Sequence, residues 1–276
     1  MYKRILTVQD ISCLGQCSMT VALPILSACG HETVILPSAV LSTHTGGFTG
    51  FTVRDLSPDF DGIIDHWTKE NIEFDAVYTG YLGNKKQVDD VERITSTLLK
   101  TEGSLIVDPA MADNGKLYYG FDDKYVKAIA HLCSKADIIL PNITEACFLC
   151  DIPYNEQVTE EYVETVISAL HERFDATVVL TGIGFEKNST GVMVSTKSGN
   201  TYTYAHKRIP QSFHGTGDIY SSAFVGAYMQ GKDINSSSRI AADYTLRCIE
   251  NTYGDENHWY GVKFETAIPY LTDLIK

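Results

Sequence analysis

The chain has 276 residues, 44% of them hydrophobic, and its 22 basic against 35 acidic residues give a formal net charge of −13. That length suits one large α/β domain or two small ones, and the acidic balance argues against nucleic acid or an anionic membrane surface as the main partner. No apolar stretch approaches the ~20 residues of a membrane span, and the apolar run before Asp10 is too short for a signal peptide. We therefore expect a cytoplasmic protein.

The seven cysteines, an odd number spread from Cys13 to Cys248, fit reduced thiols better than a disulfide framework. Cys147 and Cys150 form a CxxC, but no second pair at zinc-ligand spacing accompanies them. They also fall inside an apolar segment typical of a helix. We expect core thiols there rather than a metal or redox site.

Short apolar runs typical of buried strands alternate with segments of helical periodicity. The expected strands are residues 5–8, 32–36, 76–79, 105–107, 138–140 and 177–180, and the expected helices are residues 21–29, 88–100, from 144 onward, and 160–174. Repeated strand–helix units with apolar strands predict an α/β fold whose mainly parallel sheet is covered on both faces. Residues 193–204 predict a β-hairpin, and no linker, repeat or change in composition divides residues 1–276, which we expect to form a single domain.

Polar and glycine residues follow the expected strands. They are Gln9 and Asp10, Thr79 to Tyr81, Asp108 and Pro109, Pro141 and Asn142, and Thr181 and Gly182. Ligands of parallel sheets gather at the carboxyl ends of the strands. The sequence therefore predicts a binding site at this edge of the sheet.

Residues 38–51 are too rich in glycine and threonine for a helix and too polar for a core strand. We predict that they form a mobile flap over the site; the alternative is an ordinary surface loop.

The stretch from Phe213 to Phe224 places Thr216 between two glycines, with an acid, Asp218, directly after them. Small and apolar residues then continue at helical spacing to Tyr228, which predicts a tight loop opening into a buried helix. The first N–H groups of such a helix attract an anion, and a carboxylate beside that anion makes sense if it handles a proton or orients a hydroxyl. The stretch thus indicates a phosphoryl-transfer site; the alternative is a Gly-Thr-Gly turn with Asp218 as helix N-cap.

Two other glycine motifs do not carry nucleotide binding. Residues 226–232 spell GxxxxGK, but Asp233 follows where a P-loop needs a hydroxyl, and the match lies at the end of an expected helix. Residues 182–184 begin a dinucleotide fingerprint whose third glycine is replaced by Lys187. An NAD-type oxidoreductase therefore has little support.

Several segments together resemble the ribokinase-like small-molecule kinases, and within them the pyridoxal (vitamin B6) kinases. They are Ser42-Thr43-His44-Thr45-Gly46, Thr79-Gly80-Tyr81, Asp108-Pro109, and Pro141-Asn142-x-x-Glu145 with Gly215-Thr216-Gly217-Asp218. They stand in family order between about residues 5 and 230. The resemblance implies a ribokinase-like three-layer α/β/α fold and ATP-dependent phosphorylation of the 5'-hydroxymethyl group of pyridoxamine, pyridoxal or pyridoxine.

The same resemblance assigns roles to individual residues. Asp218 matches the family's catalytic base, and the backbone N–H groups of Gly215, Thr216 and Gly217 would hold the transferring phosphate. Asn142, Glu145 and Thr181 match positions near the ATP phosphates, and Asp108, Asp113 and Glu145 match positions near Mg²⁺, Glu145 through water. The spacing of Asn142 and Glu145 equally fits a helix capping box. The turn at residues 182–191 would contribute to the adenine side, and the need for a monovalent cation stays open.

For the acceptor, the resemblance places Asp10, His44, Thr45 and Tyr81 around the pyridine ring. Asp10 departs from the serine that is usual there, and a carboxylate could pair with a protonated ring nitrogen or with the amine of pyridoxamine. We therefore expect a preference for pyridoxamine over pyridoxal. Leu140 is a second departure, since a threonine is usual before Pro-Asn, and it removes one phosphate contact.

The nearest alternative is a sister kinase that acts on hydroxymethylpyrimidine or on a sugar. A non-catalytic protein that senses a B6 vitamer or a nucleotide is a further alternative, against which the intact Asp218 argues. The family resemblance also implies a homodimer.

Overall fold

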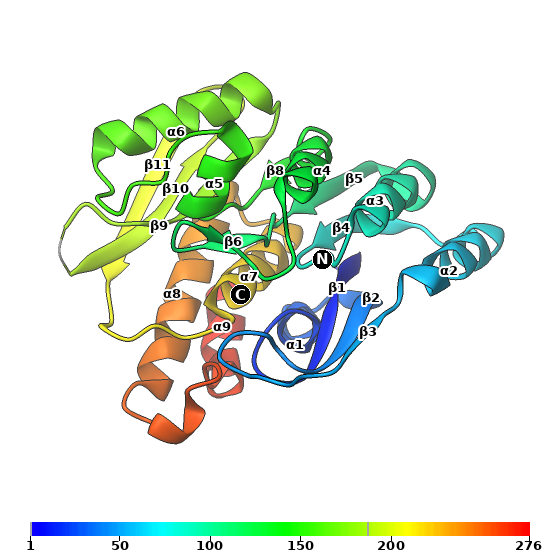
Figure 1. The fold of residues 1–276 in the computed structure, drawn as a ribbon, viewed down its shortest axis with the longest axis horizontal. Coiled ribbons are helices and arrows are strands. Elements are labelled where there is room, and N and C mark those ends of the chain that lie inside the picture. The colour runs from blue at the N-terminus through cyan, green and yellow to red at the C-terminus, as the bar shows by residue number, and fades with distance from the viewer. Residues whose placement is uncertain (1, 187) are drawn as a thin grey trace. The chain divides into compact units, whose positions relative to one another are not determined.

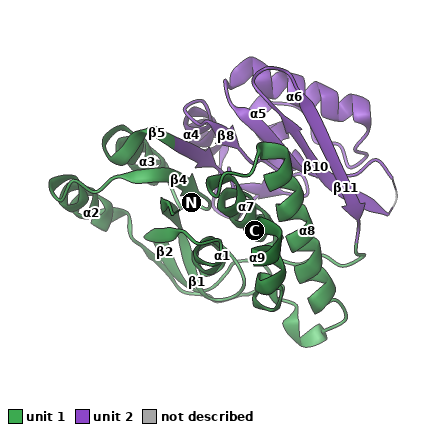
Figure 2. Ribbon diagram, turned by 180° about the vertical axis from the view of Figure 1, so that it is seen from behind, with its two compact units in different colours: residues 1–103, 209–276 green, residues 104–208 purple. Residues whose placement is uncertain are grey.

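The computed structural model describes residues 2–186 and 188–276. Its contacts divide the chain into two compact units (Figure 2): unit 1 comprises residues 1–103 and 209–276, and unit 2 comprises residues 104–208. Among the described residues, no helix is long and apolar enough to cross a bilayer. The units are described in turn.

Unit 1 contains four strands in the order β4-β1-β2-β3, with β1 parallel to β2 and β4, and β3 antiparallel to β2. Helices α1, α7, α8 and α9 gather on one side of these strands and α2 and α3 on the other (Figure 1). The elements are β1 (Arg4–Leu14), α1 (Met19–Ala28), β2 (Glu32–Thr43), β3 (Val53–Asp55), α2 (Ser57–Lys69), β4 (Phe74–Thr79), α3 (Lys85–Leu98), α7 (Thr216–Met229), α8 (Ile234–Thr252), the 3₁₀ turns Glu256–His258 and Phe264–Ala267, and α9 (Ile268–Ile275).

Helix α7 lies at the centre of unit 1, where Ile219 to Ala227 are all buried. Small residues allow this burial: a Cβ atom at Gly226 would overlap the Cys29 side chain that follows α1. The hydroxyls are satisfied, because Tyr78 of β4 donates to Ser221 Oγ (2.9 Å) and Ser221 donates to the carbonyl of Gly217 (2.7 Å). Burial without hydrogen bonds would cost each hydroxyl about 1–3 kcal/mol, so these contacts fix α7 against the strands.

Unit 2 continues from β5 (Leu99–Val107), which crosses from unit 1, and its strands follow the order β11-β10-β9-β8-β5. β5, β8 and β9 are parallel, whereas β10 is antiparallel to both β9 and β11. The remaining elements are β6 (Ala112–Asp113), β7 (Lys116–Leu117), α4 (Asp123–Cys133), β8 (Ile138–Ile139), α5 (Ile143–Cys150), α6 (Glu160–Arg173), β9 (Thr177–Ile183), β10 (Ser189–Ser195) and β11 (Thr201–Lys207). The hairpin predicted at residues 193–204 is confirmed as β10 and β11.

Two boundaries differ from the sequence-based prediction. β1 continues to Leu14 where a polar turn was expected, and β2 continues to Thr43 through residues judged too polar for a strand. The pairing between β1 and β2 explains why both strands are longer than expected, because Ile11 and Ser12 of β1 pair with Val40 and Leu41 of β2. Residues 38–43 therefore belong to the sheet, and the expected flap starts only at residue 44.

The CxxC motif lies in a helix, as expected. Cys147 and Cys150 lie in α5 as free thiols, the first buried and the second half-buried. Cys147 Sγ lies 2.9 Å from the Tyr162 hydroxyl of α6, so its contacts are those of a packed helix pair.

Candidate active site

The glycine loop before α7 has a conformation that only glycine adopts easily. Gly215 is the helix N-cap with φ 76°, and a Cβ atom there would overlap the carbonyl oxygen of Gln16. Asp218 lies in the first turn, so the alternative that made it the N-cap is wrong. The N-cap Gly215 has no side chain to occupy this terminus, and a Cβ atom at Gly217 would meet nothing within 4 Å. The N-terminus of α7 thus offers open space and a partial positive charge to an anion.

Asp10 lies inside β1, not after it as expected, at the point where the pairing between β1 and β2 becomes irregular. Only 4% of the residue is exposed, and Ser12 donates a hydrogen bond to its carboxylate (2.9 Å between Ser12 Oγ and Asp10 Oδ2). Ser18, at φ 52° and ψ −129°, forms a second side-chain hydrogen bond. Burial nevertheless raises the pKa of Asp10, because the hydrogen bonds offset only part of the desolvation cost.

The charges of Asp10 and Asp218 act on a small group of side chains in unit 1, which includes Tyr81. Burial and then the charge of Asp10 raise the pKa of Tyr81 to about 12. Burial raises the pKa of the Cys17 thiol well above its usual range, and the charges of Asp218 and Asp10 raise it further. Cys17 also touches the glycine loop, since a Cβ atom at Gly215 would lie 3.1 Å from its sulfur. Both carboxylates therefore lie close to the same half-buried, protonated thiol.

His44 begins the loop after β2 and is held in one neutral tautomer. Its Nε2–H donates to the carbonyl of Tyr260 (2.7 Å), and the Gly46 N–H donates to Nδ1 (3.1 Å). Burial lowers the pKa of His44, which keeps the imidazole uncharged at neutral pH. The rings of Phe48 and His214 lie 5.0 and 5.1 Å away between centroids.

The loop that carries His44 is thereby joined to the glycine loop. His214 directly precedes Gly215, and its ring fills the space beside Gly46, where a Cβ atom would come within 2.5 Å of Nδ1. Phe48 in turn packs on Trp259, with ring centroids 4.7 Å apart. Thr45, between these contacts, is exposed. Whether this loop moves as a flap stays a prediction.

In unit 2, Asn142 and Glu145 form the capping box that the sequence left as an alternative. Asn142 accepts from the Glu145 N–H and Glu145 Oε2 accepts from the Asn142 N–H, both at 2.9 Å. Glu145 Oε1 also accepts from the Met111 N–H (3.1 Å). Burial and the nearby charge of Asp108 raise the pKa of Glu145. The carboxylate therefore organises the main chain around residues 111–112, and its predicted role toward Mg²⁺ stays a prediction.

The other predicted positions in unit 2 lie as follows. Asp108 is buried directly after β5, and Asp113 is exposed in β6, where it accepts hydrogen bonds from Asn114. Thr181 lies inside β9 rather than after it, in a bridge with Asn142. Residue 187, in the turn assigned to adenine, lies outside the described residues.

A complete protein-borne metal cage is absent from the described part of the chain, which has no group of three or more His, Cys, Asp or Glu side chains able to hold an ion. The carboxylate oxygens of Asp108 and Glu145 are nevertheless the hard donors that Mg²⁺ takes one or two at a time when substrate phosphates complete its shell. The residues therefore fit a metal that arrives with the nucleotide.

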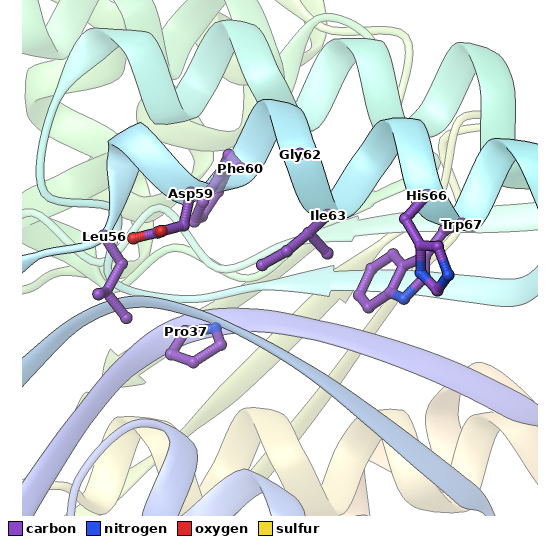
Figure 3. A pocket seen from close by; sticks show the side chains of 8 residues that line it. All are labelled: Pro37, Leu56, Asp59, Phe60, Gly62, Ile63, His66 and Trp67. Atoms are coloured by element: carbon purple, nitrogen blue, oxygen red, sulfur yellow. The ribbon is translucent and has the colours of Figure 1, made fainter.

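A cavity of about 520 Å³ in unit 1 lies away from all these residues (Figure 3). Leu56 and Ile63 extend from the α2 region toward the strand that carries Pro37. Its lining is Pro37, Leu56, Asp59, Phe60, Gly62, Ile63, His66 and Trp67. None of them was expected at the site, and this apolar groove lacks the convergent polar groups of the Asp10 neighbourhood.

Sequence reasoning missed Ser12, Ser18 and His214. Ser12 and Ser18 form side-chain hydrogen bonds with Asp10, and no sequence motif predicts these bonds. His214 was detectable, because it adjoins the glycine loop and imidazoles are frequent in sites.

Comparisons with known proteins show which family the chain belongs to. The family model for phosphomethylpyrimidine kinase matches residues 27–262. The crystal structure of a provisionally assigned phosphomethylpyrimidine kinase from Bacteroides thetaiotaomicron, in a form with pyridoxal, is 34% identical with a TM-score of 0.92 and covers 98% of this chain and 95% of that chain.

Two pyridoxal kinases are also similar. The crystal structure of the Lactobacillus plantarum enzyme is 29% identical with a TM-score of 0.90, covering 99% of this chain and 97% of that chain. The pyridoxal kinase of Arabidopsis thaliana is 26% identical over 268 residues, which are 91% of this chain and 83% of that protein. The predicted ribokinase-like α/β class with a mainly parallel sheet is thereby confirmed, and the chain is a kinase that belongs to the phosphomethylpyrimidine kinase family.

Proposed function

We propose that this kinase transfers the γ-phosphoryl group of ATP to the 5'-hydroxymethyl group of a B6 vitamer: pyridoxamine, pyridoxal or pyridoxine. The observation that carries the proposal is the position of Asp218, in the first turn of a helix whose N-cap is glycine and close to the same thiol as Asp10. Tyr81, near Asp10, and His44, near His214, supply the aromatic and imidazole surfaces that suit a planar ring. The relatives named above that bind or are named for pyridoxal support the same acceptor.

In the proposed reaction the vitamer hydroxyl oxygen attacks the γ-phosphorus of ATP. The bond between the γ-phosphorus and the β–γ bridging oxygen breaks, and ADP leaves. A carboxyl has a pKa near 4 and an alcohol resembles water at about 16, so Asp218 cannot deprotonate the ground-state hydroxyl. Asp218 instead orients the hydroxyl and accepts its proton late, as the loose transition state of phosphoryl transfer allows. The N–H groups at the start of α7 stabilise the transferring phosphate.

Asp108 and Glu145 would hold Mg²⁺, which supplies charge neutralisation for the phosphates when bound. Both carboxylates belong to unit 2, where each oxygen of Glu145 accepts a main-chain hydrogen bond. Glu145 would therefore act on the ion through water, as the family resemblance implies.

The test is Asp218→Asn, which keeps the shape of the side chain and removes its basicity. We expect turnover to fall by roughly 10²–10⁴-fold while ATP binding is retained. ADP release with each vitamer and ATP affinity by calorimetry measure the two quantities. Asp59→Asn, an exposed acid on α2, is the control that should remain active. Near-normal turnover by Asp218→Asn would refute the assignment.

A second candidate acceptor is hydroxymethylpyrimidine, favoured by the description of the matching family. It offers the same alcohol chemistry on a different ring. An acceptor panel with ATP separates the two, because the proposal requires a higher kcat/KM for at least one B6 vitamer than for hydroxymethylpyrimidine.

A further inference from the structure

Asp10 is a buried carboxylate without a cationic partner among the described residues. Burial raises the pKa of Asp10, and hydrogen bonds from Ser18, Ser12 and its own main chain lower it. No Lys, Arg or His side chain contributes to the shift in this pKa. Buried charges in proteins are ordinarily paired or bound to a cation, because an isolated one costs several kcal/mol. We therefore expect a bound ligand to supply the positive charge that pairs with Asp10.

The carboxylate is held in place for such a partner. Ser12 Oγ donates to Oδ2 at 2.9 Å, and Ser18 donates from a backbone conformation that non-glycine residues rarely adopt. An ionised carboxylate has about four acceptor positions, so two hydroxyls and one main-chain N–H leave capacity for one more donor. The charge of Asp10 raises the pKa values of Tyr81 and Cys17, so its carboxylate lies within the proposed acceptor site.

The position of the second carboxylate indicates which nitrogen fits. Asp10 and Asp218 both lie close enough to Cys17 to raise its pKa. In pyridoxamine, the aminomethyl group and the reacting hydroxymethyl group occupy neighbouring ring carbons, whereas one further ring carbon separates the ring nitrogen from the carbon that bears the hydroxymethyl group. An aliphatic amine, like that of Lys, is also fully protonated at neutral pH, while an aromatic ring nitrogen, like that of His, is a much weaker base.

We infer that Asp10, positioned by Ser12 and Ser18, binds the ammonium group of the acceptor and makes this kinase selective for amine-bearing over aldehyde-bearing substrates. The inference rests on the proposed function and narrows its substrate class to pyridoxamine. Pyridoxal and pyridoxine, which lack the amine, leave Asp10 without a counter-ion and are poorer acceptors.

The experiment compares kcat/KM for pyridoxamine, pyridoxal and pyridoxine in the wild type and in Asp10→Asn. Losing a charge-assisted hydrogen bond should lower kcat/KM for pyridoxamine by roughly 10–100-fold and leave the other two within about 3-fold. Asp59→Asn is the matched charge-removing control. Should Asp10→Asn fail to fold, Asp10→Ser makes the same comparison.

Ser18→Gly tests the positioning role separately, because glycine accepts the backbone conformation of Ser18 and removes the side chain that carries its hydroxyl. We expect KM for pyridoxamine to rise by roughly 3–10-fold with kcat unchanged and with the other two vitamers unaffected. A merely structural serine would alter all three vitamers alike.

The outcomes are distinguishable. A wild type that phosphorylates none of the three vitamers contradicts the proposed function itself. An active Asp10→Asn enzyme with an unchanged vitamer ratio, or one that loses all three vitamers equally because Asp10 pairs with the shared ring nitrogen, overturns the amine inference alone.

Discussion

At the scale of single residues, the same side-chain type serves two purposes because its surroundings differ. Asp218 is half-buried in the first turn of a helix, whereas Asp10 is buried within a strand and accepts a hydrogen bond from the neutral Ser12 hydroxyl. A buried carboxylate that awaits a cation weakens the fold until the cation binds. We therefore expect Asp10 to lower the stability of the free enzyme while it improves recognition of the acceptor.

The stability of Asp10→Asn tests that exchange. The folded pKa of Asp10 lies above its unfolded value, so between the two values the folded state holds more protons. Wild-type stability therefore falls as the pH rises through the folded pKa, and the neutral asparagine escapes this loss. We expect Asp10→Asn to melt higher than the wild type at about pH 8, by about 2–4 °C for each kcal/mol relieved, and the difference to vanish toward about pH 4.

Thermal melts of both ligand-free proteins across that pH range measure the effect, with Asp59→Asn as a control that shows no such pH-dependent gain. A variant that is less stable than the wild type at about pH 8 would show that the carboxylate has a favourable partner within the fold.

The sequence predicted the positions of Asp10 and Asp218 but not the contacts that define them. Ser18 illustrates the reason, because its hydrogen bond to Asp10 depends on a left-handed backbone conformation that no residue pattern specifies. For Glu145, the spacing from Asn142 fitted both a capping box and a nucleotide site. Only the hydrogen bonds from Met111 and Asn142 show that both of its oxygens serve the main chain.

At the scale of elements, α7 combines a tightly packed entrance with an open first turn. Gly215 cannot carry a Cβ atom without meeting the Gln16 carbonyl, whereas a Cβ atom at Gly217 enters empty space. We therefore expect Gly215 to matter for packing and Gly217, two residues further on, to matter for phosphate binding.

Substitution of each glycine by alanine should separate these effects. Gly215→Ala combines a positive φ with a main-chain clash and should destabilise strongly, by more than about 2 kcal/mol. Gly217→Ala lies in the first helical turn and should gain about 0.5–1 kcal/mol from helix propensity, yet lose at least about tenfold in turnover because its methyl group occupies the phosphate space. Urea unfolding and ADP release measure the two quantities.

Gly231 is the matched control, since it follows α7 at φ 94° with nothing within 4 Å of a Cβ atom. Gly231→Ala should cost only about 1–2 kcal/mol of backbone strain and keep its turnover. If Gly217→Ala retained full activity, the phosphate could not lie against this turn.

Strands and helices with a regular apolar pattern were predictable, whereas a helix whose first turns are rich in serine and one that starts with proline were not. Strand–helix alternation identified β4, β9 and α6 within a few residues of their ends. Helix α8 was missed because Ser236, Ser237 and Ser238 resemble a loop, although Asp233 caps the helix through the N–H groups of Asn235 and Ser236. Pro58 similarly concealed α2, where it occupies the first turn and needs no N–H partner.

At the scale of the whole molecule, composition suggested one domain, and the contacts divide the chain into two compact units. Unit 2 is an insertion between the two segments of unit 1, so unit 1 requires residues 209–276 to complete it. The first boundary falls inside β5, which runs without interruption from Leu99 to Val107. An insertion whose first strand is shared with its host differs from two domains joined by a linker.

We therefore expect the full chain to unfold as one domain despite its two units. Calorimetry of the ligand-free protein should show a single transition whose calorimetric and van't Hoff enthalpies agree, with a total of roughly 190 kcal/mol near 60 °C. The isolated segment 104–208 starts in the middle of β5 and loses Leu99 to Gly103, so it should lack a cooperative transition of its own. Two separate transitions in the full chain, with the isolated segment reproducing one of them, would instead establish two domains, because each unit would then hold a core able to fold without the rest of the strand.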